Sequence, residues 1–543
     1  MYKLFLTLRY LRSGVIAYFA IAAVALCTFL IIVVMSVMGG FLDKLKFKAR
    51  GLLGDIVVDN AMYQGFPLYD DFIAEIKAWP EVIDATPVVY SYGLLRFPQT
   101  EQTALVRVVG IRLEATYRVN AFEESLFYQK YYPGTTHLGE QRQPRLGTAD
   151  PMPVYDSDGR HEGDILRPVL FQPFRDALAQ FCEAWRNAHN GEEFAGPDDA
   201  TETLLDDFLR EQGLPPIPGV FELKPEPGEA DETGNAYPGL IIGREIVAKR
   251  DKDGRYKRHF FYPRGCEVLL ALLTSQFDTT AIKQPFRYAD DSRTGIHEID
   301  SQHVYCDFDL LQKLIYMDEA ERAEGGGTAP ARCSQIQVKI ADGVDAGELS
   351  DRLQELYQSY VQDARLDDFE RNLVDRIEAM TWEESQMHII APVEKERILV
   401  TILFGTISLV ATVLTLCILY MIVMQKTRDI GIIKSIGGSS AGVSLIFVSY
   451  GAAIGIVGSV LGLVGGFYFV KYINEFQQAL IWIHPALQVW DRSVYSFDEI
   501  PNTARTVDLI RVGTVAVVTS IVGAFAAARR AGTMHPVEAL RYG

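Results

Sequence analysis

The sequence predicts a membrane protein with four transmembrane α-helices, one before and three after a large α+β extracytoplasmic domain. Four long apolar segments predict the helices: 15–38, 398–424, 444–470 and 512–528. A helix needs about 20 apolar residues to cross a bilayer core of about 30 Å, and none of these segments contains Asp, Glu, Lys or Arg. A buried core helix of a soluble protein rarely runs this long without a charge on one face. Membrane spans are therefore favoured.

The Lys and Arg residues that flank the spans predict which side of the membrane each region faces. They cluster before the first span, between the second and third, and after the fourth: Lys3, Arg9, Arg12, Lys426, Arg428, Lys434, Arg529, Arg530 and Arg541. The positive-inside rule makes that side cytoplasmic. A cluster after the first span disagrees (Lys44, Lys46, Lys48 and Arg50), but the rule applies weakly to long translocated domains. Both termini (1–14 and 529–543) are expected inside, with 51–393 and the loop 471–511 outside.

The first apolar segment is expected to be an uncleaved anchor. It is longer than the roughly 7–15 apolar residues of a cleaved signal peptide, and Met38-Gly39-Gly40-Phe41 follows it instead of a small-x-small cleavage site. Cys27 lies within the span and is interpreted as an ordinary apolar residue. Residues 41–48 keep helical apolar spacing. The helix is therefore expected to continue as a stalk to about residue 50, where Gly51 and Gly54 end it.

Helix and strand patterns alternate in the outer domain, which predicts an α+β fold. Helical spacing occurs at 68–79, 310–316 and 346–358, and strand patterns occur at 55–59, 85–92, 104–111, 239–242, 267–273, 304–308 and 335–340. The polar residues 380–397 are expected to form a second stalk that returns to the membrane. Two stalks would transmit motion between membrane and outer domain, and continuous helix through 38–50 and 380–398 would support that hypothesis.

The chain is acidic, and the acid is concentrated in one insertion. The formal net charge is −18, and residues 131–235 hold 21 Asp and Glu against 8 Lys and Arg. The insertion is rich in Pro and Gly, so loose structure is expected, with helical spacing only at 171–185 and 203–211. An acidic surface argues against nucleic-acid binding, because phosphate contacts need Lys and Arg. Solvation is favoured over a specific partner site for this insertion.

No motif in the sequence indicates catalysis, a metal site or a cofactor. The P-loop pattern, H-E-x-x-H and C-x-x-C do not occur. Cys182, Cys266, Cys306 and Cys333 belong to the outer domain, where oxidation is possible. Four cysteines allow three pairings, and the sequence does not choose among them.

The third span carries glycines at helical spacing: Gly451, Gly455, Gly458, Gly462 and Gly466. These make three G-x-x-x-G steps, which let helix backbones approach closely in lipid. Packing within the chain is favoured over a subunit interface, and both interpretations stay open. An ion or proton pathway is not expected, because no charged residue lies inside a span.

The turn between the second and third spans, 425–443, has the pattern of a short amphipathic helix. Its candidate functional residues are Lys426, Thr427, Arg428, Asp429, Ile430, Gly431, Ile432, Ile433, Lys434, Ser435, Ile436 and Gly437. Ile432, Ile433 and Ile436 are expected on one side, with charges on the rest. Such a helix either lies on the membrane or docks in a groove of a partner, and the residues alone do not choose.

Two motifs resemble those of the FtsX-like permeases, the family that includes MacB, FtsX and LolC/LolE. Residues 425–438, Q-K-T-R-D-I-G-I-I-K-S-I-G-G, resemble the family's coupling segment, (E/Q)-K-T-R-D-I-G-I-L-R-S-I-G-A. The ending A-R-R-A at 528–531, followed by H-P-V-E-A-L-R-Y at 535–542, resembles the family's A-R-R-A…P-V-E-A-L-R. The one-plus-three arrangement of spans is also theirs.

Three further motifs are similar to the lipoprotein-releasing permeases LolC and LolE. They are S-V-M-G-G-F at 36–41, T-G-I-H-E-I-D-S at 294–301 and V-Y-S-F-D-E-I-P at 494–501. The chain departs from that pattern by its acidic insertion 131–235 and by the basic stretch 249–264.

The resemblance implies a permease subunit of an ABC transporter in a bacterial inner membrane. It implies a second permease subunit, in a homo- or heterodimer, and a separate ATPase subunit that contacts residues 426–437. ATP-driven motion would release a lipoprotein from the membrane lipids to a soluble carrier, with acyl chains expected against Ile31, Val34, Val37, Val400 and Leu403. Only 14 residues precede the first span, so no fused N-terminal ATPase is expected. The alternatives are a MacB-like exporter, an FtsX-like activator of an outer partner, and a receptor or adaptor without an ATPase.

Overall fold

The computed structural model of the chain divides into two units. It describes residues 15–60, 64–98, 102–144, 146–148, 152–155, 161–165, 168–170, 172–189, 191, 194, 199–214, 232–250, 256–258, 263–273, 282–321, 328–363, 366, 368–484, 487, 490, 500–503 and 505–533. The predicted N-terminal stretch 1–14, most of the motif at 494–501 and the tail at 534–543 lie outside these residues. A helical unit contains the chain up to residue 47 and most of it from 387 onward, and a sheet unit contains residues 48–386.

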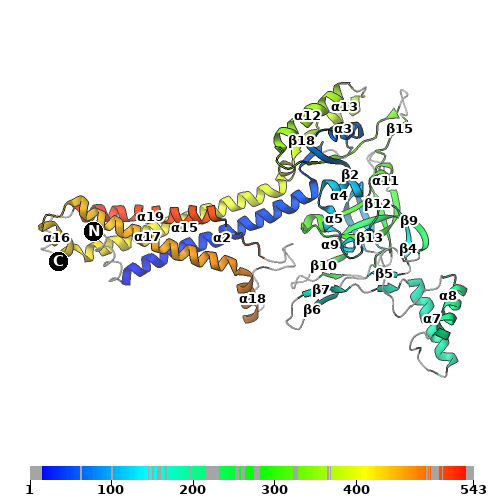
Figure 1. Cartoon of the computed structure of the whole chain (residues 1–543), viewed down its shortest axis with the longest axis horizontal. Coiled ribbons are helices and arrows are strands. Elements are labelled where there is room, and N and C mark those ends of the chain that lie inside the picture. Colours follow the sequence, from blue (N-terminus) through cyan, green and yellow to red (C-terminus); the bar gives the residue numbers. More distant parts are fainter. Residues whose placement is uncertain are drawn as a thin grey trace. The chain divides into compact units, whose positions relative to one another are not determined.

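The helical unit is a bundle of long helices that run alongside one another (Figure 1). Four are long and apolar enough to cross a membrane: α2 (Val15–Leu53), α15 (Met387–Gln425), α17 (Ser440–Lys471) and α19 (Thr506–Thr533). The shorter α16 (Thr427–Ser435) follows α15, and α18 (Ile473–Ile483) follows α17. The predicted fold class, four spans in a one-plus-three arrangement around a large α+β region, is confirmed.

The connection 471–511, which the sequence predicts as an outer loop, contains the short helix α18. Apolar residues recur along this helix at helical spacing, and its inner side packs Ile473 against Trp490 and Ile500. Asn474 holds the returning chain, since its Oδ1 accepts from the backbone N of Ile500 at 2.9 Å. This side-chain bond fixes the chain where it returns toward α19.

The sheet unit is built on a mixed sheet of ten strands in the described residues, in the order β12-β13-β9-β14-β3-β2-β17-β1-β18 with β4 paired to β9. The strands are β1 (Ile56–Asp59), β2 (Val82–Arg96), β3 (Thr103–Ile111), β4 (Glu140–Pro144), β9 (Glu232–Gly243), β12 (Glu267–Leu272), β13 (Ile282–Ser292), β14 (His303–Asp307), β17 (Gln335–Ile340) and β18 (Glu378–Thr381). Most pairs are antiparallel, but β13–β9 and β14–β3 are parallel.

Helices and small ladders surround this sheet. The helices are α3 (Tyr69–Ile76), α4 (Leu113–Val119), α5 (Phe122–Ser125), α6 (Phe127–Tyr131), α7 (Gln172–Ala188), α8 (Asp199–Glu211), α9 (Arg244–Val247), α10 (His297–Asp300), α11 (Phe308–Leu314), α12 (Ala346–Asp363), α13 (Asp368–Val374) and α14 (Trp382–Ser385). The two-stranded ladders pair β5 (Leu146–Thr148) with β8 (Pro168–Leu170), β6 (Met152–Tyr155) with β7 (His161–Ile165), β10 (Ala248–Arg250) with β11 (Tyr256–Arg258), and β15 (Ala320–Glu321) with β16 (Thr328–Ala329).

The local patterns of the sequence predict most of these elements. The expected helices at 68–79, 310–316 and 346–358 correspond to α3, α11 and α12, and the seven expected strands correspond to β1, β2, β3, β9, β12, β14 and β17. Both helices expected in the acidic insertion are present as α7 and α8, and they pack Phe181 against Phe208. The insertion is therefore more ordered in these two helices than its Pro and Gly content suggests.

The two predicted stalks differ in the structure. α2 is continuous through 38–50, as predicted, and it passes Gly51 to end at Leu53. Gly54 follows with φ 76°, the left-handed conformation common after a helix end. The prediction of continuous helix over 380–398 is wrong for residues 380–386, where β18 and α14 precede the start of α15 at Met387. The cause is a capping box in which Thr381 and Glu384 start a new short helix.

The C-terminal end of α2 is bonded into the sheet unit. Its last carbonyl groups have no partner within the helix. The backbone N of Ala121 donates to the Gly51 carbonyl at 2.7 Å, and Asn120 Nδ2 donates to the Leu52 carbonyl at 2.9 Å. These bonds fix the position at which the chain leaves α2.

Asp55 joins both chain connections of the sheet unit at the start of β1. Its carboxylate accepts from Arg50 Nη2 at 2.7 Å and from Lys339 Nζ at 3.0 Å. Its backbone carbonyl accepts from the N of Trp382, the first residue of α14, at 3.1 Å. Burial would raise the pKa of Asp55, but the bonds from Lys339 and Arg50 outweigh it and lower that pKa.

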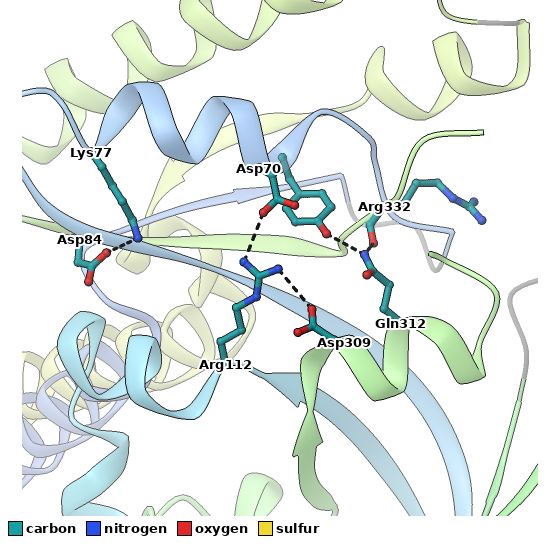
Figure 2. Close-up of polar contacts among 8 residues, drawn as sticks. Asp70, Lys77, Asp84, Arg112, Asp309, Gln312 and Arg332 are labelled. Carbon is teal, nitrogen blue, oxygen red and sulfur yellow. Dashed lines mark hydrogen bonds and ion pairs between the residues drawn. The ribbon is translucent and has the colours of Figure 1, made fainter. Parts of the chain in front are cut away.

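A second polar network ties surface helices to the sheet (Figure 2). The guanidinium of Arg112 lies between Asp70 of α3 and Asp309 of α11, with N–O distances of 3.3 Å to each. Gln312 Nε2 donates to the Tyr69 hydroxyl at 2.9 Å and to the Arg332 carbonyl at 2.8 Å. The exposed ion pairs contribute little, whereas the buried amide satisfies groups that would otherwise lack partners.

Candidate coupling segment and apolar cavity

α16 is attached to the helical unit by its first turn. The backbone N of Ile430 donates to the Lys426 carbonyl at 3.0 Å, which continues the helical bonding across the turn after α15. The Ile430 side chain is 2% exposed and belongs to the core that contains Val423 and Phe447. Asp429 lies in the first turn, where the positive end of the helix dipole favours a carboxylate.

Two glycines end α16 in a defined geometry. Gly437 has φ 97°, and its backbone N donates to the Lys434 carbonyl at 3.0 Å, while the N of Gly438 donates to the Ile433 carbonyl at 2.9 Å. This pair of bonds is a Schellman motif. Ser439 then caps α17, because its Oγ accepts from the N of Gly442 at 3.1 Å. The Gly-Gly-Ser run thus has a structural role that fixes the direction of α16.

A third attachment joins α16 to the end of α19. Lys434 Nζ donates to the Gly532 carbonyl at 2.5 Å, and Ser444 Oγ of α17 donates to the Ala528 carbonyl at 3.0 Å. Carbonyl groups in the last turn of a helix have no partner within it and attract a cation. α16 and α17 are therefore both bonded to the last turns of α19.

The outer face of α16 is exposed and mixed in character. Ile432 is 43% exposed and Ile436 is 82% exposed, and Arg428 and Ser435 are exposed on the same side. Ile433 is partly buried and packs against the core of the helical unit, at the edge of this apolar side. The helical positions 428, 432, 435 and 436 make one face, so the exposed isoleucines lie next to a cation.

The remaining predicted residues of the segment hold its local structure. Thr427 Oγ1 donates to the Met424 carbonyl at 2.7 Å. Gly431 is buried. Lys426 Nζ lies 3.3 Å from Asp429 Oδ2, a surface pair that contributes little to stability.

The glycines of α17 lie against other helices of the same unit. An added Cβ would come within 2.8 Å of the Ser520 Cβ at Gly455, 2.8 Å of the Val24 Cβ at Gly458 and 2.5 Å of the Ala25 carbonyl at Gly462. At Gly466 it would meet Ile32 at 3.2 Å, and Gly451 is buried. The G-x-x-x-G face is thus occupied by α2 and α19 within the chain.

An apolar cavity of about 500 Å³ lies between α2, α15 and α19. This volume is within the about 300–1,000 Å³ of small-molecule pockets. Ile31, Val34 and Val400, three of the five residues expected to meet acyl chains, line it. Leu403 is instead exposed, and Val37 packs near Trp490.

The sequence analysis missed two cations of this cavity. Arg397 and Arg511 line it together with Met38. A signal was present, because each arginine directly precedes an apolar segment, 398–424 and 512–528. The predicted topology brings the ends marked by Met38, Arg397 and Arg511 to the same side of the membrane.

The cysteines form no disulfide. All six are free, and Cys266, Cys306 and Cys333 are buried. Burial raises the pKa of the Cys306 thiol, which keeps it protonated and unreactive.

The comparisons with known proteins bear on the helices that carry α16. Residues 401–536 match the family model described as FtsX-like permease C-terminal. This match covers most of α15 and all of α16, α17, α18 and α19, and it confirms the resemblance of the 425–438 motif to that family.

Three relatives of known name also match the chain. It is 25% identical over 253 residues to the lipoprotein-releasing system transmembrane protein LolC of Neisseria meningitidis, which covers 46% of this chain and 54% of that protein. It is 25% identical over 329 residues to LolC of Xylella fastidiosa, covering 60% and 69%, and 28% identical over 122 residues to LolE of Haemophilus influenzae, covering 22% and 29%. The chain thus matches about half the length of the Neisseria LolC protein.

A solved structure also matches the chain. It is the periplasmic region of MacB from Actinobacillus actinomycetemcomitans, at 11% identity and a TM-score of 0.25, covering 63% of this chain and 94% of that one. The similarity to LolC and LolE agrees with the motifs at 36–41 and 294–301.

Proposed function

We propose that the chain is the permease subunit of an ABC transporter that releases lipoproteins from a bacterial inner membrane. ATP hydrolysis would occur on a separate subunit, and a second permease subunit would complete the dimer. The named relatives are lipoprotein-releasing LolC and LolE proteins. The observation that carries the proposal is the outer face of α16, which is exposed although its helix is fixed at three points.

The chemistry of this face suits a protein partner. Ile432 and Ile436 offer apolar side chains, and Arg428 offers a cation beside them. A helix laid in a groove of a partner buries such a face. Because Lys434 is bonded to the end of α19, displacement of the docked α16 would move α19 and α17 together.

The sheet unit is the proposed working domain, placed outside the membrane by the positive-inside rule. Motion would enter it through α2, whose last carbonyls are bonded to Asn120 and Ala121. It would also enter through α14, which is bonded to Asp55 at the same strand. Both connections are bonded to Asp55, within the sheet unit, at the start of β1.

The cavity between α2, α15 and α19 is the proposed site for acyl chains of the substrate. Its walls include Ile31, Val34 and Val400, and apolar chains gain about 25 cal/mol per Å² when they leave water. A lipid-anchored protein would enter this cavity before it is passed to a soluble carrier.

The proposal is tested by replacing the exposed isoleucines of α16. The Ile432→Asp/Ile436→Asp variant would place two carboxylates in the docking groove. We expect it to insert in the membrane and to lose co-purification of the ATP-binding-cassette subunit. Release of a fluorescent lipoprotein from proteoliposomes should fall at least about tenfold, the loss expected when a buried apolar contact of about 1.4 kcal/mol or more is removed.

Ile83→Asp is the matched control, since Ile83 is an exposed isoleucine of the sheet unit with no part in the proposed docking. It should keep both the ATPase subunit and lipoprotein release. Retention of full release by the α16 variant would contradict the coupling role. Absence of any ATP-binding subunit from the wild-type preparation would favour a receptor or adaptor instead.

A further inference from the structure

Two arginines on different helices share the mouth of the apolar cavity. Arg397 lies on α15 and Arg511 on α19, and both line the cavity. Each lies at the residue before an apolar segment begins, so each marks the boundary between hydrocarbon and headgroup on its helix. The side chain of an arginine at such a boundary usually extends toward water. This tendency does not explain why two arginines line the same cavity.

The charge at this mouth is not balanced by the cavity itself. No Asp or Glu is among the lining residues that the structure describes. Arg511 Nη1 lies 3.8 Å from Asp508 Oδ1, and the Arg511 side chain is 75% exposed, so this pair is weak. Two guanidinium groups that line one end of an apolar cavity offer a site for an anion.

The threonine hydroxyl groups of the cavity are bonded within their own helices. Thr28, Thr401, Thr412 and Thr519 donate to carbonyls of those helices, at 2.8, 2.8, 2.9 and 2.9 Å. Their protons are therefore used, and most of the remaining lining is apolar. The cavity combines apolar walls with a doubly cationic mouth.

We infer that Arg397 and Arg511 bind the phosphate of a phospholipid whose acyl chain occupies the cavity. Guanidinium groups bind phosphate oxygens through paired, charge-assisted hydrogen bonds, and a phospholipid places its phosphate directly at the end of its apolar chains. The inference rests on the proposed use of the cavity for acyl chains and adds a headgroup specificity to it. Acyl chains alone would need no cations at the mouth.

Native mass spectrometry of the purified full chain in detergent tests this inference. The probes are phosphatidylglycerol and diacylglycerol with the same acyl chains, which differ in the phosphate-containing headgroup. We expect wild-type protein to bind phosphatidylglycerol more tightly than diacylglycerol. The Arg397→Gln/Arg511→Gln variant should lose about tenfold or more of its phosphatidylglycerol affinity, because a neutral amide cannot form the charge-assisted hydrogen bonds to phosphate, and it should keep its diacylglycerol affinity.

Two further variants make the outcomes distinguishable. Lys471→Gln removes an exposed cation at the end of α17, outside the cavity lining, and should change neither affinity. Gly405→Leu adds a side chain to the cavity lining where an added Cβ meets nothing within 4 Å, and it should weaken both lipids.

The results distinguish failure of the phosphate site from failure of the acyl-chain cavity. Equal affinities of the wild type for the two lipids, or unchanged phosphatidylglycerol binding in the double-arginine variant, would overturn the headgroup site and leave the acyl-chain cavity intact. If Gly405→Leu left both affinities unchanged, the acyl-chain cavity itself would fail. Should the glutamine variant not fold, the Arg397→Lys/Arg511→Lys variant keeps both charges but loses the paired geometry, and unchanged phosphatidylglycerol affinity in it would likewise count against guanidinium recognition.

Discussion

The helical unit and the sheet unit are closely packed by different kinds of residue. In the helical unit, backbones approach where side chains are missing, as at Gly458 against Val24 and Gly462 against Ala25. In the sheet unit, large and charged side chains fill the core, with Arg244 and Asp291 both at 0% exposure. The first strategy suits lipid, where apolar burial gives no drive between helices. The second needs every buried charge to be matched.

The charged core of the sheet unit is centred on the end of β13. Asp291 forms an ion pair with Arg244 and a hydrogen bond with the Tyr288 hydroxyl. Its neighbour Asp290 accepts from the backbone N of Tyr128 at 2.6 Å. Burial raises the pKa of Asp290 even though Arg264 and these hydrogen bonds oppose that change. The sheet unit should therefore be sensitive to loss of a single charge.

The largest effect is expected from Asp291→Asn. The substitution leaves the buried guanidinium of Arg244 without its carboxylate, and breaking a buried pair from one side costs about 3–5 kcal/mol. We expect a lower unfolding midpoint of the full chain and faster proteolysis of the sheet unit, both measured in detergent.

Asp309→Asn is the matched control on the surface of the same unit. Asp309 is 70% exposed and shares Arg112 with Asp70, as Figure 2 shows. An exposed pair contributes about 0–1 kcal/mol, so this variant should unfold almost like the wild type. An equal drop in unfolding midpoint in Asp291→Asn and Asp309→Asn would mean that burial of the ion pair does not determine its contribution to stability.

Gly462→Ala tests the opposite strategy in the helical unit. Alanine has a helix propensity about 1 kcal/mol better than glycine, yet its Cβ would lie 2.5 Å from the Ala25 carbonyl. Overpacking of this kind costs about 1–3 kcal/mol. We expect a lower unfolding midpoint and less folded protein recovered from membranes.

Gly465→Ala is the control on the same helix, one turn away. An added Cβ there would meet only Phe29 at 3.7 Å, which is ordinary contact. It should be neutral or slightly stabilising. If Gly462→Ala also stabilised the protein, the close approach of α17 to α2 at Gly462 would not be needed for stability.

The sequence predicts the helical unit better than the sheet unit, and the reason is physical. A span must be apolar along its whole length, so the four segments are visible without knowledge of their neighbours. β13 was not predicted, because Pro285, Arg287, Asp290 and Asp291 oppose strand formation in isolation. Those charges are acceptable only because Arg244 and Arg264 come from other parts of the chain.

The candidate sites show the same limit. The motif at 425–438 predicts a short helix, but the burial of Ile433 beside exposed Ile432 depends on how α16 rests on the core. The arginines of the cavity are far apart in sequence, and only the packing of α15 against α19 brings Arg397 and Arg511 to one mouth. Local sequence patterns predict single helices and strands. A site formed by residues of three helices can be located only when the packing of those helices is known.

The smallest effect is expected from Asp55, which joins α2 and α14 to β1. Arg50 and Lys339 lower its pKa in the folded chain. The folded chain therefore binds a proton at Asp55 less tightly than the unfolded chain does. The stability that Asp55 contributes is therefore present above the usual carboxyl pKa of about 3.9 and is lost as the pH falls through its lower folded value. Asp55→Asn lacks this titration. The difference in unfolding midpoint between wild type and Asp55→Asn should shrink as the pH falls from 7 toward 3. A difference that stays constant would contradict a stabilising role of the ionised Asp55 carboxylate.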